Sequence, residues 1–471
     1  MNRVKQAQFN NGHQAAGEAC RRLALGQNVF EPAGLEAVAP QVCRAARVSP
    51  RPPFAPGRRP LLTLLALAAL CSGCQGPLAR LLPVNLQVAI SAGAGADSQS
   101  QQSLMQLTSQ VAAEYMRNNP GVNLHMRFLP ETELEATVRR RTQLGAGPDL
   151  LISRVVSAAR LDRDGLVTTT GLGLGELAPL QLRNLERFRR GASYAALPFL
   201  MQPSLACFNR RTVPQPPRRI GEIERLAAAG VRIGLPLEMQ ELLWTASDFQ
   251  ADQPLMRLLH RIQGVNDGGT TTPQDQQRLL AWLGWLARSN VQPNVVYVDA
   301  MDGLVARLEN GSLDWISCNA TSISRLRRKL GPDLAVTPLP GADDGSPARA
   351  LARFIVISFG RDSSGDERAA ARKFALFMLN DYSQTNLMVR AVGNLPANQN
   401  VIVPTKDAPE LAAMLASLKA SISLPFEAGP GATPATQERL VYLIKQNVYG
   451  EWAPPRVLAE LERLADGRAT P

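Results

Sequence analysis

Aromatic residues make up only 5% of this 471-residue chain, and histidine occurs just three times, at His13, His125 and His260. The chain therefore offers few copies of the commonest general base and metal ligand. Beyond residue 74 it also lacks the H-E-x-x-H, C-x-x-C, Walker and G-x-S-x-G motifs. These absences argue against the enzyme classes that the motifs define. A pair of catalytic carboxylates brought together only by folding stays open, because a sequence does not reveal it.

The chain also has no excess of acidic residues, because its net charge is +11. This positive charge is distributed unevenly along the sequence. Residues 1–73 hold nine of the 51 Lys and Arg residues and only three of the 40 Asp and Glu residues, so the remainder is nearly balanced. The basic runs at 139–141 and 325–329 fall on predicted helices and have no interleaved aromatic residues. We therefore expect solvated helix faces and no nucleic-acid partner.

Long hydrophobic runs are absent except for Leu61–Leu70, which follows Arg58 and Arg59. This run is too short to span a membrane but has the order of a secretory signal, with Ser72 and Gly73 as small residues at its end. The segment Cys-Ser-Gly-Cys at 71–74 resembles a bacterial lipobox, although Cys71 stands where that pattern has leucine. The resemblance implies a lipid on Cys74 and a protein anchored to a membrane in the periplasm or at the cell surface.

No methionine occurs between Met1 and Met105, and residues 1–47 of the predicted leader (residues 1–57) show no sustained helix or strand period. We expect this leader to reflect a start assigned too far upstream, with Val48 as a candidate start; a disordered N-terminal extension is the alternative. Residues 58–74 form the predicted signal peptide, and residues 75–84 form a linker.

The chain then becomes regular, with strands and helices in alternation. Hydrophobic spacing predicts strands at Leu86–Ile90, Val122–Phe128 and Leu150–Ile152, with helices at Ser103–Asn118 and Glu131–Leu144 between them. This order predicts an α/β fold with a parallel sheet and helices on both of its faces.

A second region opens at the proline-rich segment Pro214–Pro217. Its predicted helices and strands continue to the end of the chain. They are helices near Glu222–Ala229, Pro254–Gln263, Asp275–Ser289 and Glu367–Leu379, strands at Leu313–Ser317 and Phe354–Ser358, and closing helices at Gln437–Tyr449 and Pro454–Ala465.

Several segments in fixed order resemble a known family. They are "EYMRNNPGVNLHMRFLPETELEATVRRRTQLGAGPDLLIS", "YAALPFLMQPSLACFNRR", "LVARLENGSLDWISCNA", and the series "TPLPG", "ARFIVISF", "ERAAARKFALFMLND" and "VGNLPAN". Together they are similar to the bacterial extracellular solute-binding proteins of ABC importers, of the maltose-binding type (family 1). The resemblance covers about residues 85–465.

The resemblance implies a two-lobe, periplasmic-binding-protein-like (type 2) fold with a hinge and an interlobe cleft. Lobe 1 would hold residues 85–200 and 350–422, and lobe 2 residues 203–348 and 424–465. The chain would cross between lobes near Gln202, near 347–353 and around Leu424. The partners implied are a small-molecule solute and ABC permease subunits, for a monomer without cofactor or metal that performs no chemistry.

Candidate ligand contacts follow from strand ends and from the family. Ligands of open α/β sheets bind beyond the carboxyl ends of strands, and the Gly/Ala loop 93–97 after the first strand is either a ligand loop or a plain turn. Arg154 could bind hydroxyls or a carboxylate, or be solvated; Glu131 could instead cap a helix; and Trp244 could stack on a sugar or lie in the core. The full set is Ser91, Glu131, Ser153, Arg154, Gln202, Gln240, Glu241, Trp244 and Asn319.

Other aromatic residues and the cysteines have simpler predicted roles. Trp315, Trp282 and Trp285 are expected in the core. For Cys207 and Cys318 we favour buried free thiols over a disulfide, which an oxidising compartment would permit.

A sugar or polyol is the favoured ligand, although the scarcity of aromatic residues and the presence of Arg154 also suit a charged non-sugar metabolite. A surface-anchored enzyme or scaffold on the same fold is the alternative from another class. Opposed carboxylates in the cleft would favour the enzyme, and a cleft filled by apolar side chains the scaffold.

Overall fold

The computed structural model describes residues 83–91, 98–265, 269–390, 392–422, 426, 429 and 431–467. The predicted leader, the signal peptide with Cys74, nearly all of the linker, the loop 93–97 and the crossing around Leu424 lie outside these residues. The chain divides into Met1–Cys74 and a compact unit, Gln75–Pro471, to which everything below refers.

The first sheet has the predicted β-α-β-α-β order. Strand β1 (Val84–Ser91) pairs in parallel with β2 (Val122–Leu129) on one side and with β3 (Leu150–Arg154) on the other. Strand β12 (Ala352–Gly360) extends this sheet, antiparallel to β3. Because β1, β2 and β3 are parallel, their carboxyl ends lie at one edge of the sheet.

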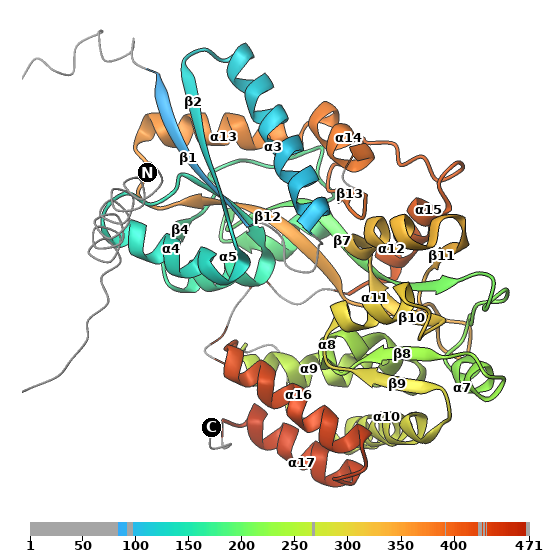
Figure 1. The fold of residues 1–471 in the computed structure, drawn as a ribbon. Coiled ribbons are helices and arrows are strands. Elements are labelled where there is room, and N and C mark those ends of the chain that lie inside the picture. The colour runs from blue at the N-terminus through green and yellow to red at the C-terminus, as the bar shows by residue number, and fades with distance from the viewer. Residues whose placement is uncertain are drawn as a thin grey trace, which may run out of the picture. The chain divides into compact units, whose positions relative to one another are not determined.

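Helices cover both faces of this sheet (Figure 1). Successive side chains of a strand point to opposite faces of the sheet, so each strand packs against the helices on both sides. Val88 and Leu150 pack in one apolar cluster with α3 (Ser98–Asn118) and α13 (Gly365–Leu379). Their neighbours Ala89 and Leu151 pack in another with α4 (Glu131–Gln143) and α5 (Val155–Arg163). The apolar strand Leu150–Ile152 is thus explained by burial on both sides.

One long strand, β7 (Leu197–Asn209), belongs to two groups of strands. Its first part pairs with β12 as far as Pro203, and its second part pairs with β10 (Trp315–Asn319) from Ser204 onward. Sheet order is β2-β1-β3-β12-β7-β10-β8-β9. The change of partner falls between Pro203 and Ser204, next to Gln202, where the sequence predicts the chain to cross between lobes. The lobe bounds themselves stay a prediction.

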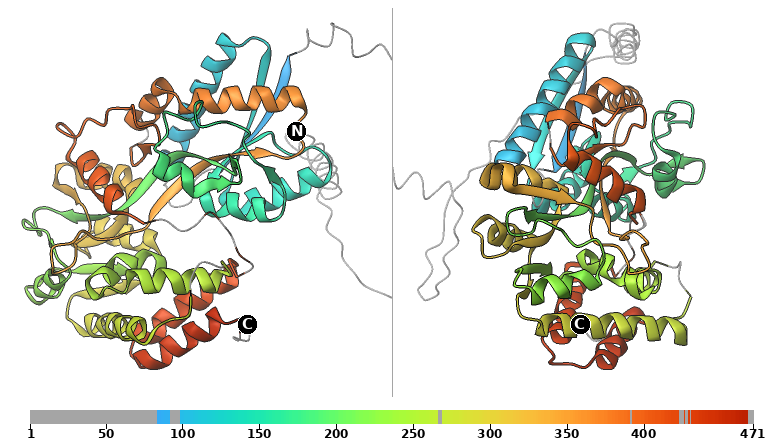
Figure 2. Two further views of the ribbon diagram at one scale, coloured as in Figure 1. Left: turned by 180° about the vertical axis from the view of Figure 1, so that it is seen from behind. Right: turned by 90° about the vertical axis from the view of Figure 1, so that its right-hand side faces the viewer.

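The second group of strands is again parallel at its centre. Strand β8 (Ile233–Pro236) pairs in parallel with both β10 and β9 (Val295–Val298), while β11 (Leu334–Thr337) pairs with β7. Helices α9 (Asp252–Gln263), α10 (Pro273–Val291), α16 (Pro434–Val448) and α17 (Pro454–Ala465) pack together beside it (Figure 2).

The predicted helices and strands are confirmed, with bounds shifted by a few residues. Trp282, Trp285 and Trp315 lie in the core as expected. The remaining elements of the described residues are β4 (Val167–Thr168), α6 (Leu182–Leu185), β5 (Arg189–Arg190), β6 (Ser193–Tyr194), α7 (Gly221–Ala228), α8 (Met239–Leu242), α11 (Met301–Glu309), α12 (Ile323–Leu330), α14 (Asp381–Arg390), β13 (Leu395–Pro396), α15 (Pro409–Ala420) and four short 3-10 helices.

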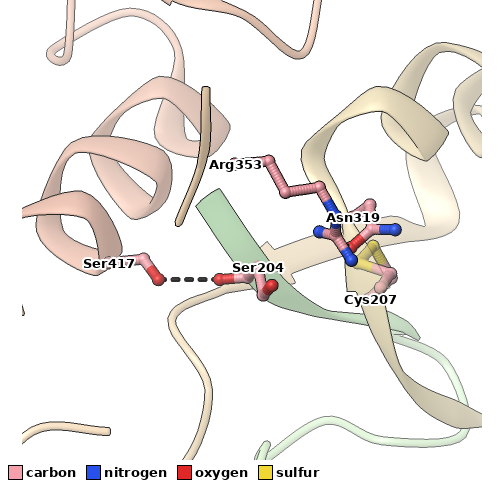
Figure 3. The surroundings of a disulfide bond; sticks show 6 residues. Ser204, Cys207, Asn319, Arg353 and Ser417 are labelled. Atoms are coloured by element: carbon pink, nitrogen blue, oxygen red, sulfur yellow. Dashed lines mark hydrogen bonds between the residues drawn. A yellow bond between two sulfur atoms is a disulfide. The ribbon is translucent and has the colours of Figure 1, made fainter. Parts of the chain in front are cut away.

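The expectation of two free thiols is wrong, because Cys207 and Cys318 form a disulfide. Strands β7 and β10 are antiparallel neighbours, and the two cysteines stand diagonally across them with a Cα–Cα distance of 5.8 Å, within the usual range for a disulfide. Figure 3 shows the bond beside Asn319 and Arg353. A separation of 111 residues hid this adjacency from sequence reasoning.

Reducing this disulfide should destabilise the protein, because the bond closes a long loop in the unfolded chain. We expect a loss of about 2–5 kcal/mol in the free energy of unfolding, measured by thermal and urea unfolding with and without dithiothreitol. The double variant Cys207→Ala/Cys318→Ala keeps the other four cysteines and should not respond to the reductant. An equal response of both proteins would contradict a role for this bond.

Candidate functional site

A cleft of about 1090 Å³ lies at the carboxyl ends of the two groups of parallel strands. One wall comes from Arg154, α4 and the start of α5, and the other from Glu238, Gln240, Asp299 and α16. Most of the functional groups that line it are charged or amide side chains. The cleft is therefore suited to a polar, hydrogen-bonding ligand.

The first wall is built at the ends of β1, β2 and β3. Ser91 closes β1, Glu131 begins α4 one residue after β2, and Arg154 closes β3. Ser91 Oγ donates a 3.0 Å hydrogen bond to Glu131 Oε2, and Arg154 Nε lies 3.6 Å from Glu131 Oε1. The residue before helix α4 is Pro130, and Glu131 therefore supports the helix as a first-turn carboxylate rather than as its N-cap.

Arg154 stays one-third exposed at the cleft surface despite its contact with Glu131. The contact is an ion pair that is longer than a hydrogen bond, so the guanidinium can direct its N–H donors toward a bound molecule. The half-buried pair orients both side chains, and its own contribution to stability is small. Deeper along the same wall, Arg160 lies 3.2 Å from Glu135.

The second wall is likewise built from polar residues at the carboxyl ends of strands, here β8, β9 and β10. Glu238 comes two residues after β8, Asp299 directly follows β9, and Asn319 ends β10. Asp299 accepts a 2.8 Å contact from Lys445 of α16. Two sheets thus present their carboxyl ends, and the polar residues there, to one cleft.

Glu238 is exposed in the cleft, yet protein surrounds it closely enough to change its acidity. Burial raises the pKa of the Glu238 carboxyl, and the positive charges of Arg353 and Arg154 oppose that rise. Among the described residues, none forms a hydrogen bond or ion pair with the side-chain carboxylate of Glu238.

Arg353 lies where the chain passes between the two groups of strands. It stands opposite Gln202 in the β12–β7 pairing, and its guanidinium forms an ion pair with Glu241 and donates to Asn319 Oδ1. Burial lowers the pKa of Arg353 to about 10, with repulsion from Arg154 in the same direction and attraction by Glu238 against it. Arg353 therefore remains a cation at neutral pH.

A turn next to this arginine holds the junction together. Gln202 Nε2 donates a 2.8 Å hydrogen bond to Asn394 Oδ1. The preceding residue, Gly393, has φ +100°, and a Cβ there would lie 2.4 Å from the carbonyl oxygen of Ala320. Only glycine fits this close approach of the turn to the end of β10.

The structure places the predicted ligand contacts in different parts of the molecule, some at the cleft and some at the junction between the two groups of strands. Glu131, Arg154 and Gln240 line the cleft, and Ser91 bonds to Glu131 at its edge. Asn319 and Gln202 lie at the junction, each held by a partner there. Whether any of them touches a ligand stays a prediction.

Three predicted contacts are buried and need correction. Ser153 is fully buried, because it lies within the β3–β12 pairing opposite Val356. The Trp244 indole is 1% exposed and packs against Trp315 with ring centroids 6.3 Å apart, so it belongs to the core. Glu241 is also buried, where it neutralises Arg353 instead of facing the cleft.

Sequence reasoning missed Glu238, Arg353 and the aromatic side chain of the cleft, Tyr442. Glu238 follows β8, a four-residue strand that was not recognised, so the polar residue at its end was not considered. Tyr442 lies on the predicted helix α16 and is 40% exposed. A search for exposed aromatic residues on that helix would have found it.

No set of three or more His, Cys, Asp or Glu side chains is placed to bind a metal ion in the described ranges. Within those ranges, no helix combines the length and apolarity needed to span a lipid bilayer.

The match to a family model identifies the class of protein. Residues 110–413 match the model of the bacterial extracellular solute-binding proteins, and the chain belongs to that family. A search of curated proteins by sequence returned no match.

Solved structures confirm the two-lobe periplasmic-binding-protein fold, of the maltose-binding type. A cyclo/maltodextrin-binding protein complexed with maltotetraose matches with a TM-score of 0.65 and 15% identity, over 82% of this chain and 97% of that one. The GacH receptor of Streptomyces glaucescens matches at 0.63 and 13%, over 82% and 97%. Maltose-bound MalE3 of T. maritima matches at 0.60 and 14%, over 81% and 98%.

Removing the charge of Arg353 should destabilise the protein, because it leaves Glu241 buried without a counter-charge. We expect Arg353→Met to lower the free energy of unfolding by about 3–5 kcal/mol, measured in urea. The double variant Arg353→Met/Glu241→Leu should recover much of that loss. If the second substitution brings no recovery, the ion pair is not the source of the effect.

Proposed function

We propose that this protein is the binding component of an ABC importer, which captures a small polar solute, preferably a sugar or polyol, between two lobes. The observation that carries the proposal is the open cleft lined by polar groups at the carboxyl ends of both groups of strands. The protein binds its solute without converting it, and a separate permease and ATPase complete transport.

The lining of the cleft favours a molecule rich in hydroxyl groups. Arg154 supplies donors, Glu131 and Glu238 supply acceptors, and Gln240 supplies both. Tyr442 offers an aromatic surface of the kind that packs on a sugar ring. The cleft is not filled by apolar side chains, which favours a binding protein over a scaffold.

Structural neighbours with the same fold support a carbohydrate as the ligand class. Their titles describe complexes with maltose, with maltotetraose and with acarbose. A charged non-sugar metabolite remains the alternative, because the cleft contains several ion pairs.

Closure of the two lobes would occur around the segments that connect them. Strands β7 and β12 run side by side there, and Leu351 forms a bridge with Ile422. We propose the lobe bounds predicted above, with these three segments as the hinge. A ligand that contacts both walls stabilises the closed form.

The proposed location is the periplasm or the cell surface. A lipid on Cys74 would hold the monomer on the membrane near its permease. The order of Arg58, the apolar run and Cys74 in the sequence supports this proposal.

Ligand binding is tested with the full-length protein in a thermal-shift screen of sugars, polyols, amino acids, polyamines and phosphate esters. A ligand at about 100 times its dissociation constant should add about 2.7 kcal/mol of stability. A response to sugars or polyols supports the proposal, and a response to another class alone would exclude a sugar or polyol as the ligand.

The same ligand should bind the Arg154→Ala variant at least about 10-fold more weakly, because a hydrogen bond to a charged group is lost. Isothermal titration measures this change. Arg211→Ala, an exposed arginine paired with Asp333, serves as the control and should bind normally. Equal affinity of the two variants would remove Arg154 from the site.

Lipidation is tested by expressing the full chain in a bacterium fed with an alkyne-labelled fatty acid. We expect label on the protein, recovery in the membrane fraction, and loss of both in Cys74→Ser. Cys71→Ser should keep the label. Label that persists in Cys74→Ser would place the anchor elsewhere.

A further inference from the structure

The charges of the side chains that line the cleft indicate a narrower class of ligand than sugars and polyols in general. Four cationic side chains line the cleft, and each already has a carboxylate partner. The pairs are Arg154 with Glu131, Arg160 with Glu135, Lys445 with Asp299, and Arg139 with Asp164.

The carboxylates of the cleft are not balanced in the same way. Glu238 and Glu438 line it, and neither side-chain carboxylate forms a hydrogen bond or ion pair with any described residue. Glu438 lies on the exposed surface of α16. Glu238 follows a central strand and lies among other charges, which makes it the more informative of the two.

Around Glu238 the negative charges exceed the positive ones. The neighbouring cations are Arg154 and Arg353, and these are already paired with Glu131 and Glu241. Three carboxylates thus share two guanidinium groups, which leaves an excess of one negative charge. Protein surrounds Glu238 closely enough to weaken its solvation, so this excess has an energetic cost until a positive group arrives.

An ionised carboxylate only accepts hydrogen bonds, whereas a protonated amine supplies three donors and a positive charge. Such charge-assisted bonds are about twice as strong as neutral ones. A neutral hydroxyl can donate to Glu238 but leaves the excess charge in place. The cationic side chains of the cleft are held by their own partners.

We propose that Glu238 binds a protonated amine of the solute, so that the physiological ligand is an amino sugar or an amino polyol. This inference rests on the proposed function, because it assigns one group of the ligand to one side chain of the same cleft. Arg154 and Gln240 would bind the hydroxyl groups of that molecule.

The test compares probes that differ only in the amine, with the full-length protein and isothermal titration at pH 7. The pairs are D-glucamine with D-sorbitol and D-glucosamine with D-glucose. N-acetyl-D-glucosamine adds a neutral amide at the same carbon, and putrescine carries amines without hydroxyls. We expect each amine to bind at least about 10-fold more tightly than its neutral partner, as for a hydrogen bond to a charged group.

Glu238→Gln keeps the shape of the side chain and removes its charge. It should abolish the preference for the amine and change the affinity for the neutral partner much less, because a neutral hydroxyl brings no positive charge to Glu238 and can still hydrogen-bond to the amide of glutamine. Glu451→Gln removes an exposed carboxylate between α16 and α17 and is the control for net charge. It should keep the preference.

Each other outcome has a distinct meaning. Neutral sugars that bind as well as amines, or a preference that survives Glu238→Gln, would overturn the inference and leave the proposed function intact. Putrescine that binds more tightly than every hydroxylated probe would keep the amine site and retire the sugar or polyol. Absence of binding by all probes would contradict both.

Discussion

The buried ion pair between Arg353 and Glu241 is the interaction on which the arrangement of the cleft depends. Arg353 belongs to β12 of the first group of strands, while Glu241 lies on α8 after β8, and Asn319 ends β10 of the second group. A guanidinium that is buried away from solvent needs a counter-charge, and the carboxylate of Glu241 supplies it. The backbone next to Glu241 includes Glu238. The ion pair therefore also fixes where the second wall of the cleft stands.

The disulfide stabilises the region around Asn319, where β7 and β10 pair. Cys318 immediately precedes Asn319, and its bond to Cys207 fastens β10 to β7. Ser417 Oγ of α15 donates a 2.7 Å hydrogen bond to the carbonyl oxygen of Ser204 on the same strand (Figure 3). Strand β7 is thus held by β10 and by α15 just beyond the point where it changes partners. The proposed hinge between the lobes would then bend before Ser204, close to Gln202.

The sequence was sufficient for the longer elements but not for short strands such as β8, nor for the residues that depend on pairing across the sheet. Hydrophobic spacing located β1, β2, β3 and their helices because each is a local pattern of a few residues. Glu131 and Arg154 were found through these strands, since the end of a parallel strand can be read from the sequence. Ser153 was wrongly assigned because burial by β12, some 200 residues away, has no local signal. The disulfide was missed for the same reason.

Trp244 and Arg353 show a second limit. Residue type alone suggests a cleft position for the aromatic ring and an exposed position for the charge, but the Trp244 ring lies in the core and Arg353 forms an ion pair at the junction beside the cleft. The ring is buried because β10 places Trp315 beside it, and the charge is tolerated because α8 places Glu241 beside it. Both outcomes depend on partners distant in sequence. The charge balance around Glu238 likewise becomes visible only when five residues from four segments are counted together, and it is this balance, rather than any motif, that carries the proposal of an amine-bearing ligand.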